Sequence, residues 1–126
     1  MKLLIDTHLL LWAVTDTLPK KAVPYFTNLE NELLFSSASI WEIIIKKSLN
    51  RPDFQIDPNA LYRGLLDNGW SELNITSYHV LFVADLPSIH KDPFDRILIA
   101  QAKAEKIVLL TSDKMVSSYS HTMFIG

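Results

Sequence analysis

HKDPFDRILIAQAKAEK, residues 90–106, places two acids at the start of an apolar helix. Asp92 precedes Pro93, and an acid before a proline at the first helical position is a usual helix start. Apolar residues then recur at helical spacing, with Ile97 and Leu98 on the buried side. Asp95 lies in the first turn, where it either bonds back to the N-cap amide or points into a crevice.

Two apolar runs elsewhere in the chain end in an acid, as buried strands that lead into a site do. KIVLLTSD, residues 106–113, follows the helix and ends in Asp113. KLLID, residues 2–6, has the same form and ends in Asp6. In parallel sheets, ligands gather outside the carboxyl ends of the strands, so neighbouring strands would bring both carboxylates into one crevice. The other interpretation is that each acid only caps the helix after it.

Helices and strands alternate along the whole chain. Alternation of this kind predicts an α/β domain with a mostly parallel sheet of four or five strands. A single domain over residues 1–126 accommodates it. We expect strands at 2–6, 32–37, 72–76, 106–113 and 122–126, and helices at 7–15, 19–31 (with a possible kink at Pro24), 38–50, 58–69, 77–86 and 92–106.

The composition is that of one domain with a substantial core, since 48% of the 126 residues are hydrophobic. The net charge of −2 argues against binding nucleic acid through bulk charge, but it allows an enzyme with a local basic rim. The absence of cysteine excludes disulfides and zinc–thiolate sites. Asp6 and His8 interrupt the apolar N-terminus, and no segment approaches the roughly 20 apolar residues of a membrane span. We therefore expect a cytoplasmic protein with no membrane partner.

Glu42 lies inside the apolar run IWEIII, an unusual place for a charge. One interpretation is an ion pair with Lys46, worth about 0.2–0.5 kcal/mol on a solvent-facing helix. Trp41 and Ile43–Ile45 leave little room for a solvated face, however, and an isolated buried charge is very unfavourable. A bound metal ion would supply the partner that this carboxylate needs.

Four separate segments can therefore deliver Asp6, Glu42, Asp95 and Asp113 to one place. Crowded carboxylates repel each other, and each raises the pKa of the others unless cations are present. Mg²⁺ and Mn²⁺ prefer oxygen ligands, and such an ion polarises a phosphoryl oxygen and activates water. The site would suit phosphodiester hydrolysis. Nearby polar groups that can orient the carboxylates or water are Thr7, Asp92, Thr111 and Ser112.

The motifs LLIDTHLLLW, SIWEIIIK, HKDPFDRILIAQA and LLTSD together resemble the PIN-domain ribonucleases, in particular the VapC-like toxins of toxin–antitoxin pairs. DPFDRILIAQA is the most specific piece, and the likeness covers nearly the whole chain. The resemblance implies a three-layer α/β/α sandwich, a Mg²⁺- or Mn²⁺-dependent endoribonuclease, an RNA substrate, a small cognate antitoxin that blocks the site, and a homodimer. Matched motif by motif, it assigns the catalytic and metal-binding roles to Asp6, Glu42, Asp95 and Asp113, with Thr111 at a polar position near them.

One segment departs from the family's pattern. Relatives commonly continue from the helix around Glu42 into a glycine turn, whereas this chain reads SLNRPDF, with Asn50 at the place of the glycine. Asparagine tolerates the left-handed backbone conformation, so we expect a loop variation that leaves the four acids in place.

The basic and aromatic residues near these motifs are interpreted as structural. Arg96 is expected to pair with an acid in preference to contacting substrate phosphate, although it remains a candidate near the site. The basic cluster at the end of the third helix is expected to be solvated and to complement the helix dipole. The tryptophans are expected to serve as core or partner surface, and the histidines show no ligand spacing. The residues concerned are Lys46, Lys47, Arg51, Trp12, Trp41, His8, His79, His90 and His121.

Three alternatives to a toxin nuclease remain. A haloacid-dehalogenase-type phosphatase also starts with an acid at a strand end, but it needs a second Asp where this chain has His8. A non-catalytic module that only binds antitoxin or RNA would tolerate loss of the acids, and all four are present. A housekeeping RNA-processing nuclease would keep the acids and lack an antitoxin.

Overall fold

The computed structural model describes residues 1–126 and is built on a sheet of five strands that all run parallel. Their order across the sheet is β3-β2-β1-β4-β5. This confirms the predicted α/β class and its parallel sheet. The strands are β1 (Lys2–Ile5), β2 (Glu32–Ser36), β3 (Ser71–Leu73), β4 (Val108–Thr111) and β5 (Thr122–Phe124).

Helices connect the first four strands in sequence, and a 3-10 turn connects β4 to β5. The longest of them is the helix predicted from the DPFDR motif. None of the helices combines the length and the apolar character needed to cross a bilayer. The helices are α1 (Thr7–Val14), α2 (Val23–Thr27), α3 (Ser37–Ser48), α4 (Pro58–Asp67), α5 (Ser77–Val83) and α6 (Pro93–Glu105), with 3-10 turns η1 (Pro52–Phe54) and η2 (Val116–Ser118).

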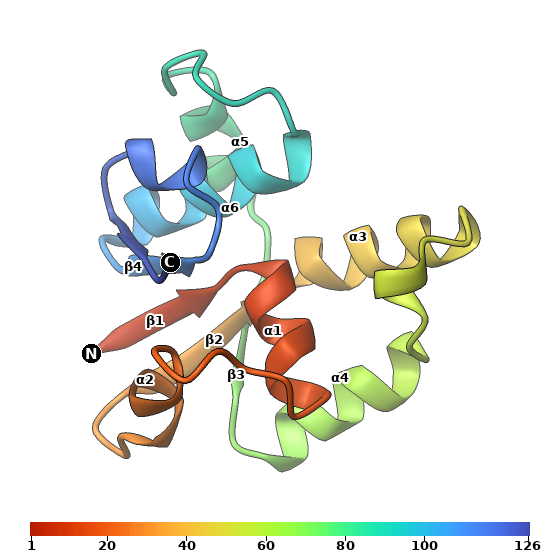
Figure 1. Cartoon of the computed structure of the whole chain (residues 1–126). Coiled ribbons are helices and arrows are strands. Elements are labelled where there is room, and N and C mark those ends of the chain that lie inside the picture. The colour runs from red at the N-terminus through yellow and green to blue at the C-terminus, as the bar shows by residue number, and fades with distance from the viewer.

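The central strand β1 divides the core into two halves. Successive side chains of a strand point to opposite faces, so Leu3 and Ile5 pack with α1 and α4, whereas Leu4 packs against α6. All three side chains are fully buried. Figure 1 shows the consequence, with α5 and α6 on one side of β1 and α1 and α4 on the other. The predicted three-layer sandwich is confirmed.

The chain changes direction across the sheet between β1 and β4. From β1 it proceeds through β2 to the β3 edge, and then returns to place β4 on the other side of β1. In open parallel sheets such a switch point leaves a crevice at the carboxyl ends of the two central strands. The Asp6 amide donates to the carbonyl of Leu110 at 3.0 Å, which ties the end of β1 to β4. The residues after the two strands therefore meet at this point.

Some predicted boundaries are wrong. The helix expected over residues 19–31 is only α2, because Pro24 stands in the first turn of that helix and begins it instead of kinking it. The third strand ends at Leu73 instead of residue 76, since Thr76 is the N-cap of α5. Asn50 adopts a φ of 57°, so the prediction of a left-handed asparagine in the turn after α3 is confirmed.

Candidate active site

A cavity of about 170 Å³ lies at the switch point, and no hydrophobic residue lines it. Four segments that are far apart in sequence contribute to it, and they bring together all four acids that the sequence singled out. Thr111 lies behind Asp6 without lining the cavity, and Arg96 does not line it either. The lining residues are Asp6, Thr7, His8, Glu42, Lys46, His90, Asp92, Asp95, Ser112 and Asp113.

Asp6 caps a helix and lines the cavity at the same time. Its Oδ1 accepts a hydrogen bond from the Leu9 amide at 2.9 Å, which caps α1. Its Oδ2 accepts from the Thr111 hydroxyl at 2.5 Å and from the Ser112 amide at 3.0 Å. Burial raises the pKa of Asp6, and these hydrogen bonds partly oppose that effect. The carboxylate is thus held rigidly by both central strands.

Glu42 is 3% exposed and has only one of its two oxygens paired. Lys46 Nζ donates to Oε2 at 2.5 Å, while Oε1 is buried without a hydrogen-bond partner. The predicted ion pair therefore exists, but it faces the cavity instead of solvent. The expectation of a solvated helix end is wrong for Lys46, whose side chain is 18% exposed and also lies 4.9 Å from the centre of the Phe54 ring.

The two acids of the DPFDR motif have separate roles. Asp92 is the cap of α6, since its Oδ1 accepts from the amides of Phe94 at 2.8 Å and Asp95 at 3.3 Å. Asp95 does not bond back to the cap and lines the cavity, which decides between its two interpretations. Burial, followed by the charges of Asp92 and Glu42, raises the pKa of Asp95 to about 6.

Asp113 closes the cavity from the end of β4. Its Oδ1 accepts from the amides of Met115 at 2.8 Å and Val116 at 3.3 Å, so it also stabilises the turn η2. Its own amide donates to the Thr111 hydroxyl at 3.0 Å, and that hydroxyl donates in turn to Asp6. Thr111 therefore links the acids that follow the two central strands.

His90 also lines the cavity, which the sequence did not predict. Its Nε2 lies 2.7 Å from Asp95 Oδ2 and 3.8 Å from Asp113 Oδ2. Potential ligand atoms of these three residues all lie within 4.8 Å of one another. No local spacing signals this position, because the loop before α6 and the turn after β4 meet only in the folded chain.

Arg96 makes no ion pair, so that prediction is wrong. Its guanidinium donates to the carbonyls of Val83, Pro87 and His90 at 3.0–3.1 Å. It also lies 3.4 Å from the Tyr119 hydroxyl. These contacts fasten the loop between α5 and α6, so Arg96 acts on the cavity only through the position of His90.

The remaining aromatic and histidine predictions divide between core and surface. His8 reaches the cavity, but its ring packs edge-on to Phe54 and its Nε2 lies 3.4 Å from Asp53 Oδ2. Trp12 packs against the core, as predicted. Trp41 is 58% exposed and lies outside the core, so for it only the partner-surface alternative stays as a prediction.

The cavity suits a hard divalent cation. Its donor set is mainly carboxylate oxygen, which Mg²⁺ and Mn²⁺ prefer. The unpaired Oε1 of Glu42 is the most direct sign, because a buried carboxylate oxygen without a partner is strongly disfavoured. Lys46 is the only lysine or arginine among the residues that line the cavity, against five carboxylates.

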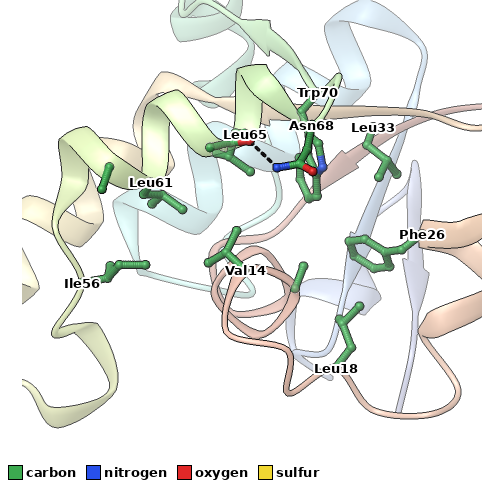
Figure 2. Close-up of a pocket in the computed structure, with 12 residues that line it drawn as sticks. Val14, Leu18, Phe26, Leu33, Ile56, Leu61, Leu65, Asn68 and Trp70 are labelled. Atoms are coloured by element: carbon green, nitrogen blue, oxygen red, sulfur yellow. Dashed lines mark hydrogen bonds between the residues drawn. The ribbon is translucent and has the colours of Figure 1, made fainter.

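A second hollow of about 570 Å³ has the opposite character. Ten of its twelve lining residues are hydrophobic, contributed by α1, α4, and the segments around α2 and β2. Figure 2 shows Val14, Leu61 and Leu65 facing Leu18, Phe26 and Trp70 across it. Asn68 is the polar residue at its edge, and its side-chain amide donates to the Gly64 carbonyl at 2.7 Å. This hollow offers apolar surface and no catalytic group.

The chain belongs to the PIN-domain family, whose model matches residues 3–121. PIN domains are nucleases and use divalent metals. No curated protein sequence matches the chain.

Solved structures of similar fold include VapBC proteins and a toxin–antitoxin complex from Klebsiella pneumoniae. VapBC2 from Rickettsia felis, bound to a DNA fragment from its promoter, has a TM-score of 0.71 at 16% identity, covering 99% of this chain and 98% of that one. DNA-bound VapBC from Salmonella typhimurium has a TM-score of 0.69 at 12% identity, covering 99% and 97%. VapBC-1 from nontypeable Haemophilus influenzae has a TM-score of 0.66 at 16% identity, covering 98% of each. At these identities the likeness shows the fold alone.

Proposed function

We propose that this protein is a metal-dependent endoribonuclease and the toxin of a toxin–antitoxin pair. It hydrolyses RNA phosphodiester bonds at the polar cavity, where Asp6, Glu42, Asp95 and Asp113 hold Mg²⁺ or Mn²⁺. The observation that carries the proposal is the unpaired, buried Oε1 of Glu42 in a cavity crowded with carboxylates. Such an arrangement is unfavourable without a cation and becomes favourable with one.

The chain's own residues prepare the cavity for this reaction. A bound Mg²⁺ or Mn²⁺ would lower the pKa of its water and stabilise charge on the phosphoryl group. Thr111 and Ser112 fix the orientation of Asp6, and Lys46 neutralises one oxygen of Glu42 while the other stays unpaired. Groups that are fixed in advance need little reorganisation when charge develops, which is the main source of electrostatic catalysis.

An antitoxin partner is supported by the apolar hollow and by the neighbours. The hollow is lined mainly by apolar side chains, and the apolar face of an amphipathic segment of a small protein would fill it. The solved structures of similar fold include VapBC complexes and a toxin–antitoxin complex from Klebsiella pneumoniae. We infer a small cognate antitoxin that covers the hollow and blocks the cavity.

A homodimer is part of the proposal as well. A further apolar hollow of about 530 Å³ lies between α3, α5 and α6, and exposed Trp41 stands at it beside Phe94. A second copy of the chain would cover this surface. The molar mass in solution, measured by light scattering on the antitoxin-free protein, tests the point: 14.4 kDa for the chain alone would reject it.

The decisive experiment is cleavage of total cellular RNA by purified, antitoxin-free protein. Reactions contain Mg²⁺, Mn²⁺ or EDTA, and Asp95→Asn serves as the inactive variant. An exposed acid outside the cavity, Asp85, gives the matched control Asp85→Asn, which should cleave like the wild type. Discrete metal-dependent fragments that disappear with Asp95→Asn are the expected result. Folded wild-type protein that cleaves no RNA with either metal would contradict the nuclease proposal.

A further inference from the structure

His90 lines the cavity, and the four-acid site gives it no task. Its ring nitrogens are not equivalent. The Lys91 amide donates to Nδ1 at 3.1 Å, so Nδ1 acts as an acceptor and carries no proton. The proton of the neutral ring then lies on Nε2, which is 2.7 Å from Asp95 Oδ2. Nε2–H therefore donates to that carboxylate oxygen.

The loop that carries His90 is fastened from the C-terminal part of the chain. The buried Tyr119 hydroxyl accepts from the amides of Ile89 at 3.1 Å and His90 at 2.8 Å. The same hydroxyl donates to the carbonyl of Pro87 at 2.8 Å. One side-chain oxygen thus satisfies three backbone groups of the segment 87–90.

Arg96 fastens the same segment from the helix that bears Asp95. It donates to the carbonyl of Pro87 at 3.0 Å and to that of His90 at 3.1 Å. Asp95 and Arg96 are adjacent on α6, so the acid and the anchor of its hydrogen-bond donor move as one unit. The position of His90 relative to Asp95 is therefore fixed by tertiary contacts and does not depend on the flexibility of the loop.

We propose that His90 is a positioning residue for Asp95, whose Nε2–H donor orients the carboxylate so that the second oxygen is available to a cation. This inference rests on the proposed metal-dependent function. It excludes His90 itself as a ligand, because Nε2 points its proton at Asp95 and the Nδ1 lone pair is engaged by Lys91. Hydrogen bonds of this kind tune ligating carboxylates, and their removal typically lowers metal affinity by about 10–100-fold.

Mn²⁺ binding to the full chain, followed by electron paramagnetic resonance, tests the inference without relying on nuclease activity. His90→Ala removes the donor, and His90→Gln keeps an N–H at a similar distance from the backbone. We expect His90→Ala to weaken Mn²⁺ binding by about 10–100-fold and His90→Gln to recover most of that loss. Bound Mn²⁺ should show no nitrogen coupling from an imidazole. The control is His121→Ala, at an exposed histidine outside the cavity, which should bind like the wild type.

Each departure from this pattern has a distinct meaning. Equal Mn²⁺ affinities for wild type and His90→Ala would overturn the positioning role alone. Imidazole nitrogen coupling that vanishes in His90→Gln would also overturn it, because His90 would then be a ligand. Wild-type protein that binds no Mn²⁺ would overturn the proposed function and, with it, this inference. Circular dichroism of His90→Ala separates loss of the donor from loss of the fold, since a native spectrum with weakened Mn²⁺ binding assigns the effect to the missing hydrogen bond.

Discussion

Replacing Asp95 with asparagine is expected to stabilise the metal-free protein while removing a residue of the candidate active site. Burial and the neighbouring charges of Asp92 and Glu42 raise the pKa of Asp95 to about 6. Above that pH the ionised carboxylate opposes folding. Asparagine has nearly the same size and carries no charge, so it removes the repulsion and leaves the packing intact.

The magnitude follows from the difference between the ordinary pKa of 3.8 and the value of about 6. At about 1.4 kcal/mol per pKa unit, this difference corresponds to at most about 3 kcal/mol of unfolding free energy. The pKa of about 6 already includes the hydrogen bond that the ionised carboxylate accepts from His90, so this bond needs no separate correction. The expected gain is up to about 3 kcal/mol, which raises Tm by roughly 5–15 °C for a chain of this size.

The pH dependence has a definite sign. The folded protein binds a proton at Asp95 with a pKa of about 6, and the unfolded chain does so near 3.8, so wild-type stability falls as the pH rises between these values. Thermal unfolding in EDTA should therefore show a gap between Asp95→Asn and wild type at pH 8. The gap should narrow as the pH falls below 6 and close below about pH 3, where Asp95 is protonated in both states.

We expect Mg²⁺ to reverse the order of the Tm values of wild type and Asp95→Asn. Mg²⁺ should raise the Tm of the wild type, because it binds the folded state alone, and should leave Asp95→Asn nearly unchanged. A Tm for Asp95→Asn at or below that of wild type at pH 8 in EDTA would show that the ionised Asp95 carboxylate does not destabilise the folded protein. Asp85→Asn, at an exposed acid outside the cavity, should show no gap at either pH.

Three further substitutions test the supporting contacts. Lys46→Met leaves Glu42 buried without the lysine that neutralises it. Urea unfolding in EDTA should show a loss of roughly 3 kcal/mol in the free energy of unfolding, which Mg²⁺ partly restores. An unchanged unfolding midpoint would mean that the ion pair contributes nothing to stability. Tyr119→Phe leaves backbone groups of segment 87–90 unpaired, so their amide exchange should accelerate and stability should fall by about 1–3 kcal/mol. Asn50→Gly should keep the free energy of unfolding within about 0.5 kcal/mol of the wild-type value. Asn50→Val should lower it by more than about 1 kcal/mol, because the φ of 57° disfavours a branched side chain. Equal effects of the two substitutions would contradict that explanation.

The features that sequence reasoning predicted correctly depend on residues that are close in the chain. Asp6 and Asp113 were recognisable because each follows an apolar strand, and parallel strands place such ends on the same edge of a sheet. Asp92 was recognisable as a cap because Pro93 follows it directly. The motif pattern then identified the family, and the fold agrees.

The features that sequence reasoning missed depend on contacts between distant segments of the chain. His90 reaches the cavity because Tyr119, 29 residues later in the chain, fastens its loop. Lys46 resembled a solvated helix end, but η1 supplies Phe54 beside it and turns its ammonium toward Glu42. The helix over residues 19–31 failed for a local reason, since Pro24 is compatible with a helix start as well as with a kink.

The hydrogen bonds from Thr111 and Ser112 to Asp6 span 105 and 106 residues of sequence. During synthesis, Asp6 therefore acquires these partners only after Thr111 and Ser112 have been added to the chain. Such long-range pairing forms late in folding. We expect a nascent chain on the ribosome to have no catalytic activity, because the cavity is incomplete until residues 108–113 have emerged. A chain truncated at Ile107 should accordingly bind no Mn²⁺, and tight binding by that fragment would disprove this order of assembly.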